Sequence, residues 1–343
     1  MLKNFKRVGA VVLALAMAFS VMCVSAFADG GVGTDSIKIT KEVTTDGNTM
    51  APNTSFTFTI APAAKGTYDG KTVYAGVAGG ASFGGNTTTD ITFTPGGKGD
   101  AAATYTGNAT ITTSVDAFDG KPGIYHYTVT ETKGNYEGIT YDTDTRDLYV
   151  YVTNSGSGVA VSNVVLTKGS TKTDKWTNDY GDTHDTTHDV TISKKVTGNM
   201  ADTNKEFSFT VKVDGASGEK YKFVVNGTEE NPLESGTGTT ITLKGGQKAQ
   251  IYGLTESDKV TATEEDYSSD GYTTTVTTSS ISGKAARGVT DGNVSADGAT
   301  VDVTNDKSVD PPTGVILTVA PYVLMVAVAA GIAVFFLRRR NAE

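Results

Sequence analysis

Two sets of lysine, glutamate and asparagine residues occupy positions where side chains should point into a protein core. The first set is Lys41, Glu131 and Asn178, and the second is Lys194, Glu264 and Asn305. Each residue shares its odd or even parity with the apolar residues of its own alternating segment, and side chains alternate between the two faces of a strand. Buried lysine and glutamate are costly unless their charges are removed. The same three residue types in two successive blocks therefore indicate a shared chemistry.

These residue types can form a covalent amide without an external enzyme. Burial depresses the pKa of a lysine, so that its amine is free to attack. Burial also raises the pKa of a glutamic acid, which can then donate a proton and polarise an asparagine amide. Attack on the asparagine side-chain carbonyl would expel ammonia and leave a neutral cross-link. The alternative is that each lysine is a surface residue whose aliphatic stem lies along apolar neighbours while its ammonium reaches water.

Short alternating segments must position these six residues. They lie at 37–43, 56–60, 125–131, 148–152 and 176–180 in the first block, and at 190–196, 207–211, 260–264 and 301–305 in the second. Segment 61–99 is glycine-rich and predicts long loops with weak strands near Val73 and 91–93. No stretch outside the chain ends has a sustained helical period. We therefore predict an all-β protein of two tandem β-sandwiches, at 29–183 and 190–309, joined by a polar linker at 184–189.

The pattern resembles a known family, the self-cross-linking immunoglobulin-like (CnaB-type) domains of Gram-positive pilins. The resemblance is to the two-domain streptococcal T-antigen type of backbone (major) pilin, and it covers essentially the whole chain. Segment 127–132, with the sequence YTVTET, is similar to that family's E-box. The resemblance implies isopeptide bonds from Lys41 to Asn178, promoted by Glu131, and from Lys194 to Asn305, promoted by Glu264. It implies a structural subunit that needs no cofactor and no metal and is no enzyme beyond this autocatalytic step.

The C-terminus has the order of a surface-anchoring signal. The motif 310–314, with the sequence DPPTG, precedes an uncharged run of 23 residues at 315–337 and a basic tail at 338–343. At about 1.5 Å per residue, this run can cross a hydrocarbon core of roughly 30 Å as a transmembrane helix, with the tail in the cytoplasm. Pro311, Thr313 and Gly314 resemble the motif that a sortase cuts between Thr and Gly, although Asp310 replaces the usual leucine. The alternative is a plain membrane anchor with a proline-rich stalk.

The N-terminus and the composition agree with export. Residues 1–28 have a basic start, an apolar core and an Ala-Phe-Ala end, which is typical of a cleaved signal peptide. The only cysteine, Cys23, lies inside this segment, so the exported chain has no disulfide. Without the signal peptide and the tail, 23 basic and 37 acidic residues remain, a net charge of −14. This charge argues against a nucleic-acid partner.

A backbone pilin also needs a lysine that accepts the threonine acyl group of the next copy. By similarity to the T-antigen members we predict Lys172, followed by Lys168 and Lys175. The expected partners are other copies in a covalent head-to-tail polymer, the sortase, peptidoglycan at the base, and any minor pilins and host-surface ligand; only the precursor meets the membrane. The expected location is a pilus anchored to the Gram-positive cell wall. The main alternative is a monomeric sortase-anchored adhesin that binds a host protein or glycan through its long loops.

Overall fold

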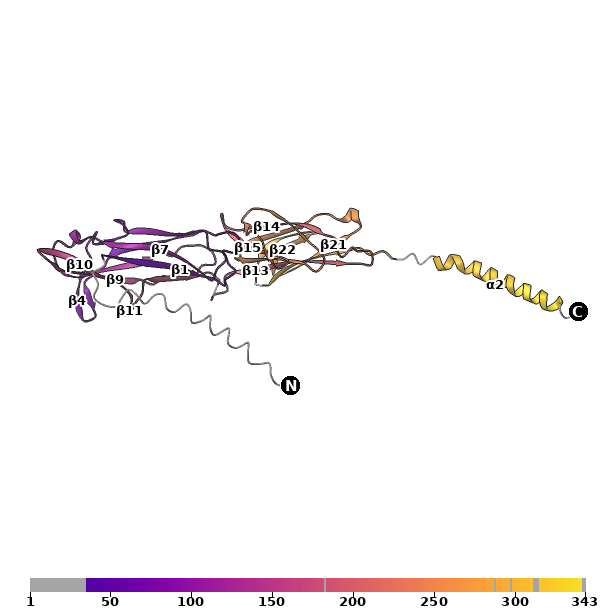
Figure 1. Ribbon diagram of the computed structural model, residues 1–343, viewed down its shortest axis with the longest axis horizontal. Helices are drawn as coiled ribbons and strands as arrows, with labels where there is room; N and C mark the ends of the chain where they lie inside the picture. Colours follow the sequence, from indigo (N-terminus) through magenta and orange to yellow (C-terminus); the bar gives the residue numbers. More distant parts are fainter. Residues whose placement is uncertain (1–34, 182, 287, 297, 311–314, 341–343) are drawn as a thin grey trace, which may run out of the picture.

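The computed structural model describes residues 35–181, 183–286, 288–296, 298–310 and 315–340. Its regular structure is mostly β-strand, and the strands form two elongated bodies that lie end to end along the long axis (Figure 1). Helix α2 (Val315–Arg340) lies beyond the second body. The predicted all-β class with two tandem sandwiches is confirmed.

Two facing sheets form the N-terminal sandwich. Its strands are β1 (Ser36–Thr44), β2 (Thr54–Pro62), β3 (Gly66–Tyr68), β4 (Lys71–Ala75), β5 (Ala81–Ser82), β6 (Thr88–Phe93), β7 (Thr104–Thr113), β8 (Gly123–Glu131), β9 (Arg146–Ser155), β10 (Gly158–Lys168), β11 (Thr171–Lys172) and β12 (Lys175–Asp179), with a short 3₁₀ helix at Val115–Phe118. One sheet has the order β12-β1-β7-β5, and the other has β11-β10-β9-β8-β2-β6 with β4 beside β8 and β3 beside β4. The first and last strands, β1 and β12, are parallel neighbours.

The C-terminal sandwich repeats this arrangement of its first and last strands. Its strands are β13 (His188–Thr197), β14 (Phe207–Asp214), β15 (Lys220–Val225), β16 (Thr228–Glu229), β17 (Leu233–Glu234), β18 (Thr239–Leu243), β19 (Lys248–Leu254), β20 (Lys259–Glu264), β21 (Thr273–Ser279), β22 (Ile281–Ala286), β23 (Val289–Val294) and β24 (Ala299–Asp306), with a 3₁₀ helix at Ser268–Asp270. The sheets have the orders β16-β15-β19-β13-β24-β21, with β17 beside β15, and β18-β14-β20-β23-β22. Strands β13 and β24 are again parallel neighbours.

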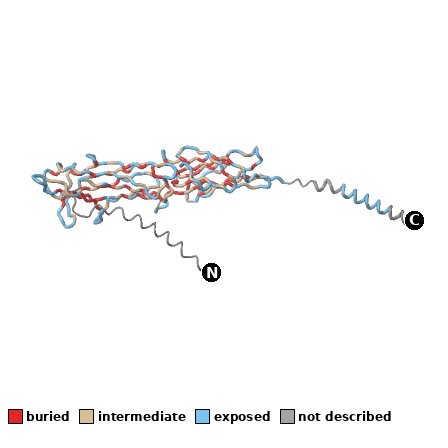
Figure 2. The backbone as a smooth tube through the Cα atoms, in the orientation of Figure 1, coloured by how far each residue is buried: buried red, intermediate tan, exposed pale blue. Residues whose placement is uncertain are grey.

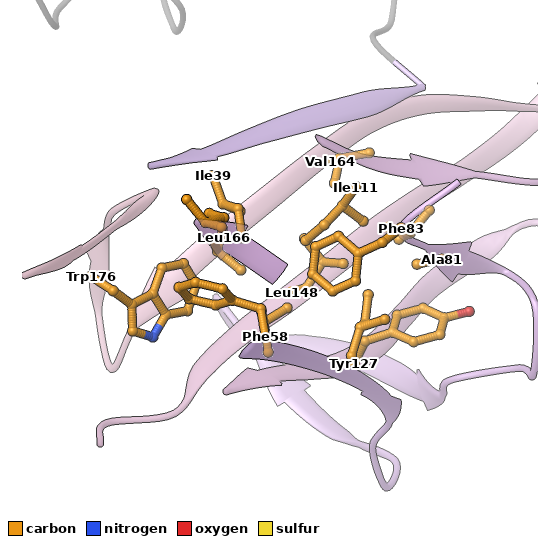
Figure 3. Packing of buried hydrophobic residues seen from close by; sticks show 14 of the residues in the cluster. Ile39, Phe58, Ala81, Phe83, Ile111, Tyr127, Leu148, Val164, Leu166 and Trp176 are labelled. Atoms are coloured by element: carbon orange, nitrogen blue, oxygen red, sulfur yellow. The ribbon is translucent and has the colours of Figure 1, made fainter. Parts of the chain in front are cut away.

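Each sandwich encloses an apolar core, because alternate residues of strands such as β1, β2 and β14 face inward. In the first core, Ile39 from one sheet packs in the same cluster as Phe58 and Leu148 from the other (Figure 3). The rings of Phe58 and Trp176 meet edge to face, with centroids 5.2 Å apart. Each large apolar side chain that is fully buried contributes about 1.5–3 kcal/mol. Buried residues run along the inside of both bodies (Figure 2).

Segment 61–99 differs in part from the prediction of long loops. The weak strands expected near Val73 and 91–93 are present as β4 and β6, but β3 and β5 were not predicted. Strand β4 lies parallel beside β8, where Tyr74 is opposite Tyr125. This pairing joins residues about 50 positions apart, so the local sequence carries little sign of it.

Hydrogen bonds and a buried acidic cluster connect the two bodies. The Tyr136 hydroxyl of the first body donates to Glu219 Oε1 of the second at 2.7 Å. The Tyr221 hydroxyl lies 2.7 Å from Glu219 Oε2 and 3.1 Å from Asp258 Oδ1. Burial raises the pKa of Asp258 to about 7, and the charge of Glu219 acts in the same direction. Two carboxyl groups thus share one poorly solvated space at the junction, and the protonated form of Asp258 is favoured.

This junction should make stability depend on pH through Asp258. The folded pKa of about 7 lies above the usual unfolded value, so the folded chain holds an extra proton between about pH 4 and 7. The contribution of Asp258 to the free energy of unfolding is therefore fully present below this pH window and is lost as the pH rises through it. Asp258→Asn should remove this loss, about 4 kcal/mol, and flatten the difference in unfolding free energy between pH 4 and 8.

Chemical denaturation of the wild-type chain and the variant over this pH range measures the effect. Asp291→Asn is the matched control, because Asp291 is a surface carboxylate that pairs with Lys259 at 2.7 Å. Its pKa is lowered, so the control should not flatten the profile. An unchanged pH slope in Asp258→Asn would contradict the assignment.

The predicted chain ends and linker lie partly outside the described residues. The signal peptide, 1–28, is outside them, and 188–189 of the predicted linker belong to β13. Helix α2 spans the predicted membrane segment 315–337. Among the described residues, no helix is both long enough and apolar enough to cross a membrane. The membrane role of this segment stays a prediction.

Candidate cross-linking sites

The first site lies where β1, β8 and β12 meet in the N-terminal core. Lys41 comes from the middle of β1, Glu131 from the end of β8 and Asn178 from β12. The Lys41 ammonium donates to Glu131 Oε2 at 2.8 Å, and Asn178 Nδ2 donates to Glu131 Oε1 at 2.6 Å. The exposed fractions are 0% for Lys41, 4% for Glu131 and 0% for Asn178. The structure thus brings the three predicted residues together, with the carboxyl group between the amine and the amide nitrogen.

The surroundings of this site favour neutral groups. Burial lowers the pKa of Lys41 to about 8, although the adjacent Glu131 favours its charged form. Burial likewise raises the pKa of Glu131 above its usual value, against the influence of Lys41 and Asn178. The Lys41 Nζ lies 4.7 Å from the centre of the Phe56 ring, which is part of the apolar wall. Both shifts move the pair toward a free amine and a carboxylic acid, the forms that amide formation requires.

The second site has the same three residue types in the C-terminal core. Lys194 lies on β13, Glu264 ends β20 and Asn305 lies on β24. Lys194 Nζ is 2.9 Å from Glu264 Oε1 and 4.2 Å from the centre of the Phe207 ring. Burial lowers the pKa of Lys194. Within the described part of the chain, neither polar atom of the buried Asn305 amide has a hydrogen-bond partner.

Two functional neighbours of the first site were missed by the sequence reasoning. The backbone N–H of Asp142 donates to Asn178 Oδ1 at 2.7 Å. Arg146 donates to Asp142 Oδ2 at 2.6 Å and lies over the Trp176 ring, 4.7 Å from its centre. A signal for Arg146 was available, because it shares its parity with the inward residues Leu148 and Val150 of β9. No signal identified the N–H, since every residue except proline has one.

Some of the residues predicted to join one subunit to the next lie within the described part of the chain, and others lie outside it. Pro311, Thr313 and Gly314 lie outside the described residues. Lys172 is exposed on the short edge strand β11. Lys168 is exposed and pairs with Asp144, whereas the Lys175 ammonium lies 2.6 Å from Glu42 Oε1. In the described residues, no cluster of three or more His, Cys, Asp or Glu side chains could hold a metal ion.

Fold and sites together define a tandem β-sandwich protein with one buried Lys–Glu–Asn group in each domain. Residues 37–181 match the family described as the Spy0128-like isopeptide containing domain, and residues 188–307 match a domain family of unknown function. The chain is 32% identical over 312 residues to a pilin of Streptococcus pyogenes serotype M1, a match that covers 86% of this chain and 87% of that protein. The chain therefore belongs to the streptococcal major-pilin family.

Solved structures of pilins share the fold. A crystal structure of the major pilin from Streptococcus pyogenes superposes with a TM-score of 0.57 at 25% identity, covering 82% of this chain and 100% of that one. The major pilin T-13 from the same species gives a TM-score of 0.52 at 26% identity, covering 80% of this chain and 98% of that one. The matches span both sandwiches, so the likeness extends to the two-domain architecture.

Proposed function

We propose that this chain is a backbone subunit of a covalent cell-surface pilus, built from copies of itself. The observation that carries this proposal is a buried Lys–Glu–Asn group in each domain of a chain of the major-pilin family. In both domains, the lysine and the asparagine lie on the first and last strands, which are parallel neighbours. A link between these strands closes each sandwich on itself, which suits a fibre subunit. Nothing in the comparisons supports the alternative of a monomeric adhesin.

The proposed chemistry is isopeptide formation between Lys41 and Asn178, and between Lys194 and Asn305. The lysine Nζ–Cγ bond forms, the asparagine Cγ–Nδ2 bond breaks and ammonia leaves. In the first domain, Glu131 contacts both nitrogen atoms, so it can give its proton to the leaving nitrogen and accept one from the amine. The carboxyl group ends in its starting state. The neutral amide also replaces a buried ionisable amine in the core, which favours the product.

The proposed assembly uses a lysine of the N-terminal sandwich and the C-terminal motif. A sortase would cut between Thr313 and Gly314 and transfer the Thr313 acyl group to Lys172 of another copy, with Pro311 as part of the recognised motif. The last transfer would join the polymer to peptidoglycan, so the subunit would be anchored to the Gram-positive cell wall. Exposure of Lys172 on an edge strand supports its role, because an acceptor amine must reach the active site of another protein.

Lys172→Ala should abolish the covalent polymer. In a Gram-positive host that expresses the chain with its cognate sortase, denaturing gels of wall extracts should show a ladder of high-mass species for the wild type. The variant should give only monomer joined to the wall, since Thr313 can still be transferred to peptidoglycan.

Lys38→Ala is the matched control, because Lys38 is an exposed lysine on β1. It should retain the ladder. A ladder that persists in Lys172→Ala and disappears in Lys168→Ala or Lys175→Ala would show that Lys168 or Lys175, and not Lys172, is the acceptor. A single wall-linked species in the wild type would contradict the pilus function itself.

A further inference from the structure

The two Lys–Glu–Asn groups differ in what contacts the asparagine oxygen. In the first domain, Asn178 Oδ1 accepts the Asp142 N–H at 2.7 Å. This contact fixes the orientation of the amide, because an N–H can only donate and must therefore face the oxygen. Asn178 Nδ2 then faces Glu131, to which it donates at 2.6 Å. The carbonyl and the leaving nitrogen thus have separate partners before any bond forms.

We propose that the Asp142 N–H stabilises the oxyanion that forms on Asn178 when Lys41 attacks; this inference rests on the proposed cross-linking function. As the Nζ–Cγ bond forms, the carbonyl electron pair moves onto Oδ1, which becomes negatively charged. The proton of the attacking amine goes to Glu131, and the proton of Glu131 goes to Nδ2. When the carbonyl re-forms, the Cγ–Nδ2 bond breaks and ammonia leaves. Among the described residues, the N–H of Asp142 is the one donor that contacts the atom carrying the transient charge.

The geometry meets the requirements of an oxyanion-binding donor. Such donors act at about 2.7–3.1 Å from the developing charge and are most effective where water is excluded. Asn178 has an exposed fraction of 0%, and both Asn178 and Lys41 contact the buried Glu131. Glu131 cannot supply this stabilisation, because its two oxygens contact the two nitrogen atoms. The carboxyl group therefore serves proton transfer, while the backbone N–H serves charge stabilisation.

The loop that carries this donor is attached to β12 on both sides of Asn178. On one side, Thr140 and Asp179 exchange two backbone hydrogen bonds, of 2.8 and 3.0 Å. On the other side, Arg146 Nη2 donates to the Lys175 carbonyl at 3.0 Å and to Asp142 Oδ2 at 2.6 Å. Burial opposes ionisation of Asp142, but the hydrogen bonds from Arg146 and the Asp144 N–H, together with nearby positive charge, hold the pKa of Asp142 below its usual value. The donor is thus held in place before the reaction, as oxyanion stabilisation requires.

The second domain has no equivalent donor in the part that the structure describes. Neither polar atom of the Asn305 amide has a hydrogen-bond partner among the described residues. The connection after Glu264 runs only over 265–272, whereas the connection after Glu131 runs over 132–145. Glu264 Oε2 instead accepts from Thr274 Oγ1 at 3.2 Å. We therefore expect the first cross-link to close faster than the second, within one chain.

The experiment follows both links during cell-free synthesis of the full chain. Samples are quenched at intervals in acidic denaturant, and peptide mapping by mass spectrometry measures each link separately. In the test variant, residue 142 is the α-hydroxy analogue of aspartate, introduced by nonsense suppression, which replaces the N–H by an ester oxygen. The first link should then close about 10²–10³-fold more slowly. The second link should keep the wild-type rate.

Two further observations tell whether the Asp142 N–H stabilises the oxyanion or whether residue 142 only supports the fold of the loop. The fluorescence of Trp176, the only tryptophan, reports that the first sandwich has folded in each variant. Asp142→Ala keeps the N–H and loses the carboxylate that bonds to Arg146, while the Thr140–Asp179 pair still holds the loop, so its first link should close faster than in the ester variant. A first link that closes as slowly in Asp142→Ala as in the ester variant, with native Trp176 fluorescence in both, would overturn the proposal. So would an ester variant that reaches native fluorescence and links at the wild-type rate.

Failure of this inference can be told apart from failure of the proposed function. A wild-type chain that never loses ammonia at the first site would refute the cross-linking chemistry as a whole. A wild-type chain that loses ammonia as fast as the ester variant would refute only the role of the Asp142 N–H.

Discussion

Glu131→Ala should leave Lys41 and Asn178 unlinked, so that the chain retains one ammonia that the wild type has lost. The reason is that no other described carboxyl group contacts both reacting nitrogen atoms. Glu264→Ala should have the same effect at Lys194 and Asn305, where Glu264 is the carboxylate 2.9 Å from the lysine. General acid–base catalysis typically contributes about 10²–10⁴-fold in rate. Loss of the carboxyl group should therefore stop cross-linking on the time scale of expression.

The intact mass of the recombinant chain from Asp29 to Val309 measures both sites at once. The wild type should lack two ammonia molecules, each single variant should lack one, and the double variant should lack none. Glu265→Ala is the matched control, since Glu265 is exposed and adjacent to Glu264. A wild-type mass equal to that calculated from the sequence would show that the buried residues stay as an ion pair and an amide.

Loss of the first cross-link should lower the stability of the N-terminal sandwich by much more than an ordinary polar substitution does. A link between Lys41 and Asn178 closes a loop of 137 residues. In the chain-entropy treatment used for disulfides, such a loop stabilises the folded state by about 5 kcal/mol. Asn178→Ala should therefore lower the Tm of this domain by on the order of 15 °C.

Trp176 makes this measurement specific to one domain. It is the only tryptophan and lies fully buried two residues before Asn178, so its fluorescence follows unfolding of the first sandwich alone. Thr177→Ala, at the exposed position between them, is the control and should shift the Tm by a few degrees at most. A shift of only that size in Asn178→Ala would match the loss of hydrogen bonds without a covalent link.

Strand parity allowed the fold class and the placement of the six buried polar residues to be read from the sequence. Lys41 has the parity of Ile39 and Val43, and in a sandwich with one solvated and one buried face this parity decides the direction of the side chain. The repeated pattern in the second block removed most of the ambiguity that a single strand would leave. The relation to pilins followed from these residues, and the comparisons confirm it.

The remaining features depend on contacts that no local pattern encodes. The Asp142 N–H reaches Asn178 only because Thr140 pairs with Asp179 across the fold. The acidic junction brings Glu219 and Asp258 of the second sandwich beside Tyr136 of the first, and these residues are far apart in the sequence. Segment 61–99 gained two unpredicted strands for the same reason, since β3 depends on β4, which lies beside β8.

The parallel pairing of β13 and β24 has a consequence for the length of a fibre. With the proposed links in place, tension would enter a subunit at Lys172 and leave at Thr313. Residues 195–304 then lie inside a closed covalent ring between Lys194 and Asn305, which sit on these neighbouring strands. At about 3.5 Å per residue, this ring withholds about 380 Å of chain from extension. Residues 35–168 lie outside the path between the two attachment points. A stretched subunit could lengthen only through its short connecting segments, so the contour length of the fibre would stay nearly constant.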